Sequence, residues 1–325
     1  MNIQIKNSSS KPKKVTTTKI ERKVSSVKKA TVTAPAIKKS VRTDHKFQLL
    51  TRHPSYAPLR KLLPRMAFRL IARFGSTTVV EDAMSKGGKT LEINEVRGVR
   101  NSASKLLMKK CFTAAGVTSA SWWTVRAGKF CQADDQTKVI ALDKLPFPLI
   151  VKSHHGSRGE GNSLCKTPAE LTRFMSSRDM SNYILEEYMT YSREYRLHIN
   201  AIDGTCFYTC IKLIKNDTPE EERFQRHDDN CVWYVESNPK FDKPVNWDKI
   251  VSECIKAIRS VGLDVGAIDL KVQSAKDSKG NTRKDPAFIV IETCSAPSMG
   301  DITTERYTKE LPKLAITKAK QLSLI

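Results

Sequence analysis

A lysine and a glycine-rich loop follow a short apolar strand in the middle of the 325-residue chain. The run FPLIVKSHHGSRGEGN starts at Phe147, and Lys152 ends its strand before Gly156, Gly159 and Gly161. Side chains obstruct a phosphate that approaches backbone N–H groups, so several glycines in one loop favour phosphate binding. The lysine adds a positive charge beside the loop. Glycines also form ordinary turns, so the loop alone leaves both interpretations open.

Two acidic residues occupy opposed positions in a predicted hairpin late in the sequence. The segments VGAIDLKV (265–272) and AFIVIET (287–293) are strand-like, and a polar loop joins them. Folding that loop symmetrically places Asp269 opposite Glu292, where like charges destabilise an antiparallel pair. A bound cation would compensate them, and oxygen ligands favour Mg²⁺ held together with nucleotide phosphates. A shifted register, with one carboxylate in solvent, is the alternative.

A second positive charge lies at the start of a predicted helix. The helix is expected to run through residues 104–115, with Asn101 or Ser102 as its N-cap and Gly116 as its end. Its predicted apolar face consists of Leu107, Cys111 and Ala114. Lys105 falls in the first turn, where a cation opposes the helix dipole. This position suits a phosphate ligand, although a lysine-rich chain can also place one there by chance.

An acidic strand and a charged hairpin lie between these motifs. Residues 183–188 (YILEEY) form a predicted strand with two adjacent glutamates, and Asp203-Gly204 is the predicted turn of a hairpin over residues 193–213. The charged positions on one face of this hairpin are Glu194, Arg196 and His198, with Lys212 on the return strand. Such a face is often simply solvated, and binding of a charged substrate is the functional interpretation.

The remaining sequence predicts the elements that position these motifs. A capping box at Thr167–Glu170 starts one helix, and Asn246 starts another that ends at Val261. The basic amphipathic run at 59–74 predicts two short helices packed on the fold, with binding to a membrane surface as the weaker alternative. Other short elements are expected to be strands at 78–80 and 91–93, a strand opened by Trp122 and Trp123, and a helix over 134–142.

Half of the excess positive charge lies in the first seventh of the chain. The formal net charge is +22, and residues 1–46 contain thirteen Lys or Arg against two acidic residues, a net charge of +11. This segment has no Phe, Trp or Tyr, so it cannot bury enough apolar surface to fold and is predicted to be a disordered tail. Its charge favours attraction to nucleic acid, whereas a solubilising or dispensable extension is the alternative.

Cysteine spacing and hydropathy limit the class of protein. The eight cysteines include no CxxC pair, so a zinc site is not expected. We expect the cysteines to be reduced thiols in the cytoplasm. No apolar run approaches the roughly 20 residues of a membrane span. The first segment also lacks the apolar centre of a secretion signal. A cytoplasmic protein of two or three compact units is therefore expected.

In their order, these motifs resemble the ATP-grasp superfamily of carboxylate–amine ligases, which includes D-alanine:D-alanine ligase and the ribosomal-protein glutamate ligases. The similarity runs from about Asn101 to Leu311. It implies an α+β fold in which two α+β subdomains clasp ATP beside a small leading α/β subdomain. The implied parts are the basic tail at 1–46, the leading subdomain at 47–100, a small lid subdomain at 101–190 and a C-terminal subdomain with the metal site at 191–325.

The resemblance also implies roles for individual residues. Lys105 in SKLLMKKCFTAAGV and Lys152 in PLIVKSHHGSRGEG would contact nucleotide phosphates. The other implied nucleotide-binding residues are Gly156, Ser157, Gly159 and Gly161 in the lid, Glu186, Glu187, Tyr188 and Met189 in the adenine-binding linker, and Glu194 at the ribose. Asp269 and Glu292 would hold two magnesium ions. Arg196 and Lys212 would orient the substrate carboxylate or the γ-phosphate.

The implied reaction is ATP-dependent ligation through an acyl phosphate. A carboxylate attacks the γ-phosphorus of ATP and releases ADP, and an amine or similar nucleophile then displaces phosphate. Metal ions, cationic side chains and a lid that excludes water suit this chemistry. The implied partners are ATP, a carboxylate and an amine, carried by an amino acid, a peptide, a protein side chain or a modified nucleobase. Nucleic acid is a further candidate partner for the basic tail.

Two positions depart from the pattern of the family. Cys294 replaces an asparagine that ligates magnesium in many members, and a thiol is a soft ligand for so hard a cation. Ala267 replaces an arginine found in some ligases. These changes support the alternative function, a nucleic-acid-binding module that binds ATP without turnover. Covalent catalysis by Cys294 with His198 is less favoured, because no spacing in the sequence brings them together.

Overall fold

The structure, a computed structural model, describes residues 47–51, 53–62, 68–80, 90–133, 137–156, 161–219, 222–224 and 230–325. The predicted basic tail and the predicted lid residues Ser157 and Gly159 lie outside the described residues.

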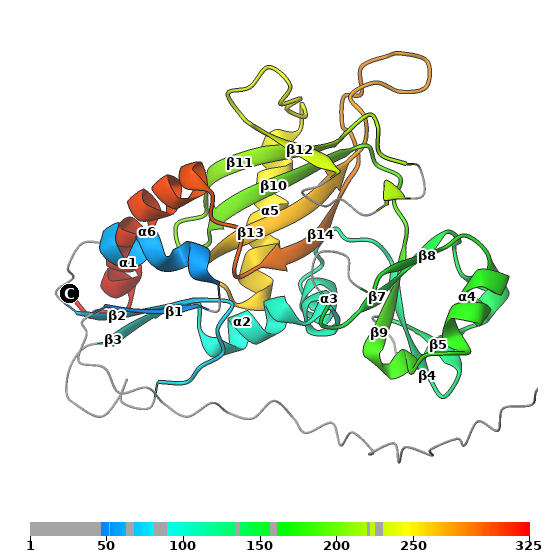
Figure 1. Cartoon of the computed structure of the whole chain (residues 1–325), viewed down its shortest axis with the longest axis horizontal. Helices are drawn as coiled ribbons and strands as arrows, with labels where there is room; N and C mark the ends of the chain where they lie inside the picture. The colour runs from blue at the N-terminus through cyan, green and yellow to red at the C-terminus, as the bar shows by residue number, and fades with distance from the viewer. Residues whose placement is uncertain are drawn as a thin grey trace, which may run out of the picture. The chain divides into compact units, whose positions relative to one another are not determined.

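Figure 1 shows how the helices and strands are arranged. In chain order they are β1 (Phe47–Thr51), η1 (Pro54–Tyr56), α1 (Ala57–Leu62), β2 (Arg69–Phe74), β3 (Thr90–Ile93), α2 (Val96–Ala103), α3 (Lys105–Ala114), β4 (Trp122–Arg126), β5 (Lys129–Gln132), β6 (Val139–Ile140), η3 (Leu142–Lys144), β7 (Leu149–Ser153), β8 (Ser163–Cys165), α4 (Pro168–Met175), η4 (Met180–Asn182), β9 (Tyr183–Glu187), β10 (Arg193–Asn200), β11 (Thr205–Ile214), β12 (Cys231–Val235), α5 (Trp247–Val261), β13 (Val265–Val272), β14 (Phe288–Cys294) and α6 (Asp301–Gln321).

The strands form three sheets. A parallel sheet has the order β1-β2-β3. An antiparallel six-stranded sheet has the order β6-β5-β4-β9-β7-β8, and an antiparallel five-stranded sheet has the order β12-β11-β10-β13-β14. Helices and largely antiparallel sheets are thus combined, and the predicted α+β class is confirmed.

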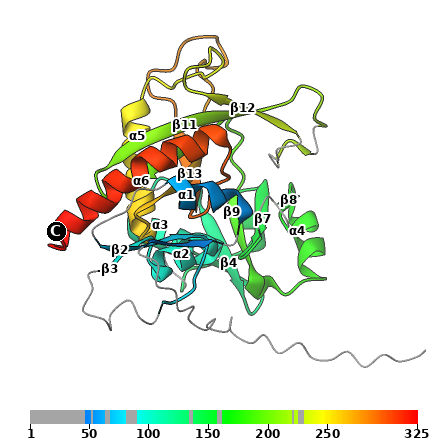
Figure 2. The same ribbon diagram turned by 60° about the vertical axis from the view of Figure 1, so that its left-hand side comes forward.

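The first sheet shares its apolar cluster with helices from both ends of the described chain. Leu70 and Leu91 of the sheet meet Leu59 of α1 and Tyr307 and Leu311 of α6. Figures 1 and 2 place α6 beside α1. Neither α6 nor any other helix in the described ranges has the length and apolar run needed to cross a membrane.

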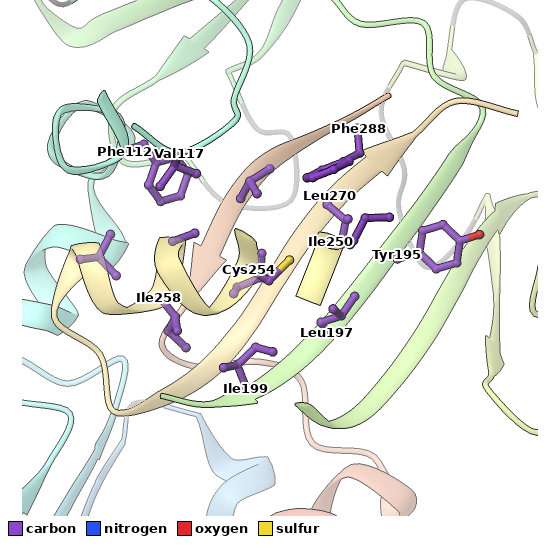
Figure 3. Close-up of a cluster of buried hydrophobic side chains, with 14 of the residues drawn as sticks. Phe112, Val117, Tyr195, Leu197, Ile199, Ile250, Cys254, Ile258, Leu270 and Phe288 are labelled. Carbon is purple, nitrogen blue, oxygen red and sulfur yellow. The ribbon is translucent and has the colours of Figure 1, made fainter. Parts of the chain in front are cut away.

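Helix α5 covers one face of the five-stranded sheet (Figure 3). The cluster between them includes Ile250, Cys254 and Ile258 from the helix, at four-residue intervals, and Leu197 and Leu270 from the strands. The predicted helix is confirmed, and it ends at Gly262, whose φ of +82° favours glycine. Because successive side chains in a strand point to opposite faces, Arg196 and Asp269 face away from α5.

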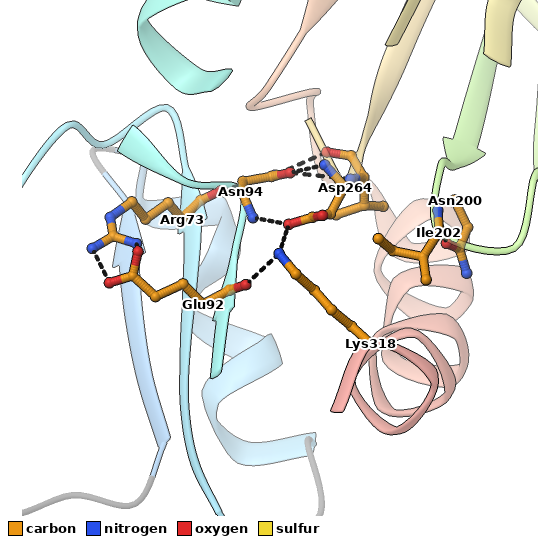
Figure 4. A network of polar contacts seen from close by, with 8 residues as sticks. Arg73, Glu92, Asn94, Asn200, Ile202, Asp264 and Lys318 are labelled. Atoms are coloured by element: carbon orange, nitrogen blue, oxygen red, sulfur yellow. Dashed lines mark hydrogen bonds and ion pairs between the residues drawn. The ribbon is translucent and has the colours of Figure 1, made fainter. Parts of the chain in front are cut away.

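A buried polar network ties the first sheet and α6 to the start of β13 (Figure 4). The Asn94 side-chain amide donates to the carbonyls of Arg73, at 3.1 Å, and Val265, at 2.8 Å. Its side-chain oxygen accepts from the backbone N–H groups of Asp264 and Val265, at 2.9 and 3.0 Å. The ammonium group of Lys318 binds the Asp264 carboxylate at 2.8 Å. Residues distant in sequence therefore fix the position of β13.

Three predicted elements are wrong. Residues 69–74 form β2, the central strand of the parallel sheet, instead of a helix. The segment 78–80 is not a strand, and part of the expected 134–142 helix is the edge strand β6. In β2, apolar side chains are buried on both faces, so the alternation typical of a half-exposed strand is absent.

Candidate active site

The face of the five-stranded sheet opposite α5 carries the predicted acidic pair. Arg196 of β10 pairs in register with Asp269 of β13, and Asp269 pairs with Glu292 of β14. The register predicted from loop symmetry is therefore confirmed, and the shifted register is wrong. An irregularity in the pairing follows Asp269. The two carboxylates thus stand side by side on neighbouring strands.

Arg196 neutralises the first of these carboxylates. Its Nε and Nη2 atoms donate to the two carboxylate oxygens of Asp269, at 2.6 and 2.7 Å. Burial would raise the pKa of Asp269, but the charge and hydrogen bonds of Arg196 outweigh burial and lower it. The guanidinium also lies 4.9 Å from the ring centroid of Trp233. The ammonium nitrogen of Lys212 lies 5.0 Å from the same centroid. The sequence did not point to Trp233.

Glu292 differs from Asp269 because no described residue donates a hydrogen bond to its carboxylate. Burial raises its pKa and the neighbouring charge of Asp269 raises it further, whereas Lys105, Lys152 and Arg196 oppose this rise. A bound divalent cation would supply the missing positive charge. The described residues hold no group of three or more His, Cys, Asp or Glu arranged for a metal. This pair therefore suits a cation whose other ligands come from phosphate or water.

Cys294 follows the acidic pair on β14. Burial raises the pKa of its thiol to about 11, so the protonated form dominates at neutral pH. A protonated thiol is a poor magnesium ligand. The departure at this position therefore leaves Asp269 and Glu292 as the oxygen donors of the predicted metal site.

Lys105 lies in the first turn of α3, as predicted, and its ammonium group donates to the Gly156 carbonyl at the edge of the lid. The backbone N–H of Lys105 also donates to the His154 carbonyl at 2.9 Å. The helix cap is Ser104, which accepts from the Leu107 N–H, so the predicted caps Asn101 and Ser102 are wrong. A second helix, α2, ends immediately before Ser104 and contains both of them.

Lys152, the penultimate residue of β7, lies beside a buried carboxylate. Its ammonium nitrogen lies 2.8 Å from Oε2 of Glu186, and the ammonium nitrogen of Lys109 lies 3.3 Å from the same oxygen. Burial would raise the pKa of Glu186, but the charges of Lys109 and Lys152 hold it below its usual value. The sequence analysis missed Lys109. It predicted an apolar face of Leu107, Cys111 and Ala114, whereas the buried side chains of α3 are Met108, Lys109 and Phe112.

The predicted adenine-binding linker continues from β9. Lys271 lies 5.0 Å from the ring centroid of Tyr188, and its ammonium group donates to the Met189 carbonyl at 3.4 Å. Glu187 precedes the linker and is half-buried. On the neighbouring strands, Glu194 is 3.7 Å from the ammonium group of Lys212.

Predicted residues from α3, from the six-stranded sheet and from the five-stranded sheet interact electrostatically. The charges of Lys105 and Lys152 both act on Glu292, and Lys105 also interacts electrostatically with Glu186. Lys212 contributes to the low pKa of Asp269. Gly161, the last glycine of the predicted lid, has a φ of +71°, a conformation that side chains disfavour. The arrangement can hold a polyanion between two lysines and a carboxylate-bound cation.

The sequence of residues 119–242 matches the model of the ATP-grasp domain. This match covers β4 to β12 and ends before the two strands that carry Asp269 and Glu292. No curated protein sequence matches the chain significantly.

Among solved structures, the chain is similar to D-alanine–D-alanine ligase from Bacillus anthracis. One structure of that ligase, complexed with ATP, has a TM-score of 0.52 and 14% identity, covering 84% of this chain and 96% of the ligase. A second has a TM-score of 0.53 and 12% identity, covering 85% and 97%. Carboxyaminoimidazole ribonucleotide synthase from Aspergillus clavatus, complexed with ATP, gives a TM-score of 0.47 and 13% identity. The similarity covers 70% of this chain and about half (53%) of that synthase.

Proposed function

We propose that the chain is an ATP-dependent ligase of the ATP-grasp superfamily that joins a carboxylate to an amine or a similar nucleophile, a proposal supported by the domain match over residues 119–242 and by the similar fold of D-alanine–D-alanine ligase. The observation that carries this proposal is the convergence of two lysines and two paired carboxylates. Lys105 and Lys152 act electrostatically on Glu292, which pairs with Asp269 across β13 and β14. A triphosphate with a divalent cation has the charges that this site complements.

Lys105 and Lys152 are the proposed phosphate ligands. Lys105 donates to the Gly156 carbonyl, which supports a role in which its ammonium group would exchange that carbonyl for a phosphate oxygen. The lid from Gly156 to Gly161 would close over the phosphates. We assign the base to the linker at Tyr188 and Met189 and the ribose to Glu194. The six-stranded sheet would then form the lid side of the site and the five-stranded sheet the opposite side.

Asp269 and Glu292 are the proposed magnesium ligands. Their fit rests on Glu292, whose carboxylate accepts no hydrogen bond from the described residues and whose pKa is raised by burial and by Asp269. Magnesium bound with ATP neutralises negative charge on the phosphate oxygens and thereby favours attack at phosphorus. Arg196 would keep Asp269 ionised and oriented, and Cys294 would contribute no ligand.

The proposed reaction has two steps. A substrate carboxylate oxygen bonds to the γ-phosphorus as the bond to the ADP oxygen breaks, which gives an acyl phosphate and ADP. The nitrogen of an amine then attacks the acyl carbon, phosphate leaves, and the amine loses a proton. In this proposal Arg196 and Lys212 would orient anionic groups, and a closed lid would exclude the water that hydrolyses the acyl phosphate.

The substrates that we propose are a carboxylate and an amine carried by an amino acid, a peptide, a protein side chain or a modified nucleobase. The last of these accords with the net charge of +11 in the first 46 residues. We also propose a cytoplasmic location, because all eight cysteines are free.

Release of ADP provides the test. The purified chain is incubated with Mg²⁺, ATP and pools of amino acids and amines, and ADP is measured together with amide products by mass spectrometry. Release that depends on Mg²⁺ and on both pools supports a ligase. ATP binding without release under any pool would contradict it.

A second candidate function, ATP binding without turnover in a nucleic-acid-binding protein, has one observation in its favour. Arg196 takes both oxygens of Asp269, and Cys294 adds no oxygen ligand. A thermal shift distinguishes binding from turnover, because a ligand at a hundredfold excess over Kd stabilises the fold by about 2.7 kcal/mol. Stabilisation by ATP in the absence of ADP release would favour this candidate.

A further inference from the structure

Glu186 binds two buried lysines through one oxygen. Its Oε2 atom lies 2.8 Å from the ammonium nitrogen of Lys152 and 3.3 Å from that of Lys109. Glu186 and Lys152 are 3% and 8% exposed, and Lys109 is fully buried. One carboxylate is therefore shared by two cations, and the group of three carries a net positive charge.

The group of three is incompletely satisfied within the described part of the chain. Oε1 of Glu186 has no hydrogen-bond partner there, and the ammonium group of Lys109 has none with good geometry. Burying an ammonium group is unfavourable unless it is paired, so packing alone gives no reason for a lysine at this position. An apolar side chain of similar length would fill the space without that cost.

Lys109 and Lys105 are four residues apart, so they lie on the same side of α3. Lys105 reaches the Gly156 carbonyl at the lid edge, whereas Lys109 points into the protein at Glu186. Of the cations near Glu186, Lys152 is the one at the end of the strand that leads into the lid. If Lys152 bound a phosphate, it would have to weaken its bond to Glu186.

We propose that Lys109 is a positioning residue that keeps Glu186 neutralised when Lys152 turns from this carboxylate to the nucleotide phosphates. This inference rests on the proposed binding of ATP and adds a residue to it. Without Lys109, every shift of Lys152 toward phosphate would leave a buried carboxylate without a cation, and Lys152 would stay with Glu186. With Lys109 present, the carboxylate retains one ion pair in both states.

The first test compares neutral and charged replacements of Lys109. We expect Lys109→Met to weaken ATP binding, measured by calorimetry, about tenfold or more, which is the factor that 1.4 kcal/mol represents. Lys109→Arg keeps the charge and is expected to restore most of the affinity. Lys110→Met is the matched control, because Lys110 is the exposed neighbour on the same helix, and it should bind ATP like the wild type.

The second test removes the carboxylate. In a Glu186→Gln background there is no buried anion to neutralise, so adding Lys109→Met should change the Kd for ATP by less than about twofold. An equal loss in both backgrounds would show that Lys109 contacts the nucleotide itself and would overturn the inference. So would a Lys109→Met chain with a lower Tm but an unchanged Kd, since that is the result of a purely structural role.

Two further outcomes are informative. If the single variant Lys109→Met does not fold, Lys109→Gln replaces it as the neutral variant. The double variant Lys109→Met/Glu186→Gln is then still compared with Glu186→Gln. If the wild-type chain binds no ATP, the proposed function fails and this inference falls with it. Wild-type binding that Lys109→Met leaves undiminished overturns only the role of Lys109.

Discussion

Asp269 and Glu292 are paired across β13 and β14. Among the described residues, Arg196 donates two hydrogen bonds to Asp269 and none donates to Glu292. The same pairing therefore gives one carboxyl group a lowered pKa and the other a raised one. Of the two carboxylates, Glu292 is therefore the one that an added cation would stabilise more.

Replacing Glu292 should separate catalysis from folding. We expect Glu292→Gln to lower the rate of ADP release at least about a hundredfold, because it removes a proposed ligand of the cation that stabilises the transferred phosphoryl group. The Tm should stay unchanged or rise, because repulsion with Asp269 is lost. ADP release and thermal unfolding are measured on the same preparation. An unchanged rate would reject the proposed metal site.

Asn94 should be among the most sensitive polar positions for stability. Its side chain makes four hydrogen bonds to backbone groups of residues 73, 264 and 265 in a fully buried site. Asn94→Ala leaves those groups without partners, and we expect a loss of about 3–5 kcal/mol in the free energy of unfolding. Asn101→Ala is the control, because within the described part of the chain the Asn101 side chain makes a single hydrogen bond, to the Val261 carbonyl. Urea unfolding should show a much smaller loss for this control.

His198 should make the fold sensitive to acid. Burial, aided by the charge of Arg196, lowers its pKa from 6.5 to about 3. The unfolded chain binds a proton at this histidine below about pH 6.5 and the folded chain does not, so stability falls as the pH falls from 6.5 toward 3. Near pH 5 this contribution amounts to about 2 kcal/mol.

The variant His198→Gln removes this titration. Its free energy of unfolding, measured in urea, should approach or exceed that of the wild type as the pH is lowered from 7 to 5. Other groups titrate in both chains, so the difference between the two curves isolates His198. Parallel curves over this range would mean that the imidazole is protonated in the fold.

The basic tail should determine any affinity for nucleic acid. Deleting residues 1–46 removes thirteen Lys or Arg, and we expect affinity for DNA or RNA to fall at least about tenfold at moderate salt, with a shallower dependence on salt. ADP release with small substrates should not change. Fluorescence anisotropy over a series of salt concentrations measures the slope. An unaltered slope would assign the contact to the remaining residues.

The parts of the fold that sequence predicts are those with local signals. The stripe of Ile250, Cys254 and Ile258 before Gly262 specifies α5, because helical periodicity and a left-handed end act within one element. The capping box at Thr167 specifies α4 in the same way, and its cap hydrogen bond is present. Loop symmetry was sufficient to align Asp269 with Glu292.

The features that the sequence analysis missed depend on distant partners. Arg69–Phe74 is a strand because parallel strands flank it on both sides, and its own pattern resembles a helix. In the sequence, Lys109 is one of several lysines on a basic helix. Its partner Glu186 lies on β9, far away in the sequence. Helix α6 contains Pro312, which weakens the helical signal, although tertiary packing at Tyr307 and Leu311 maintains the helix.

The bond between Lys318 and Asp264 has a consequence for the choice of residues to mutate. Asp264 directly precedes the strand on which Asp269 lies, so α6, late in the sequence, helps to hold a strand of the proposed ATP site through Lys318. A change at Lys318 should alter how firmly that strand is held while leaving every proposed ligand of ATP in place. Proximity to the proposed nucleotide site is therefore an incomplete guide to which substitutions would impair the proposed reaction.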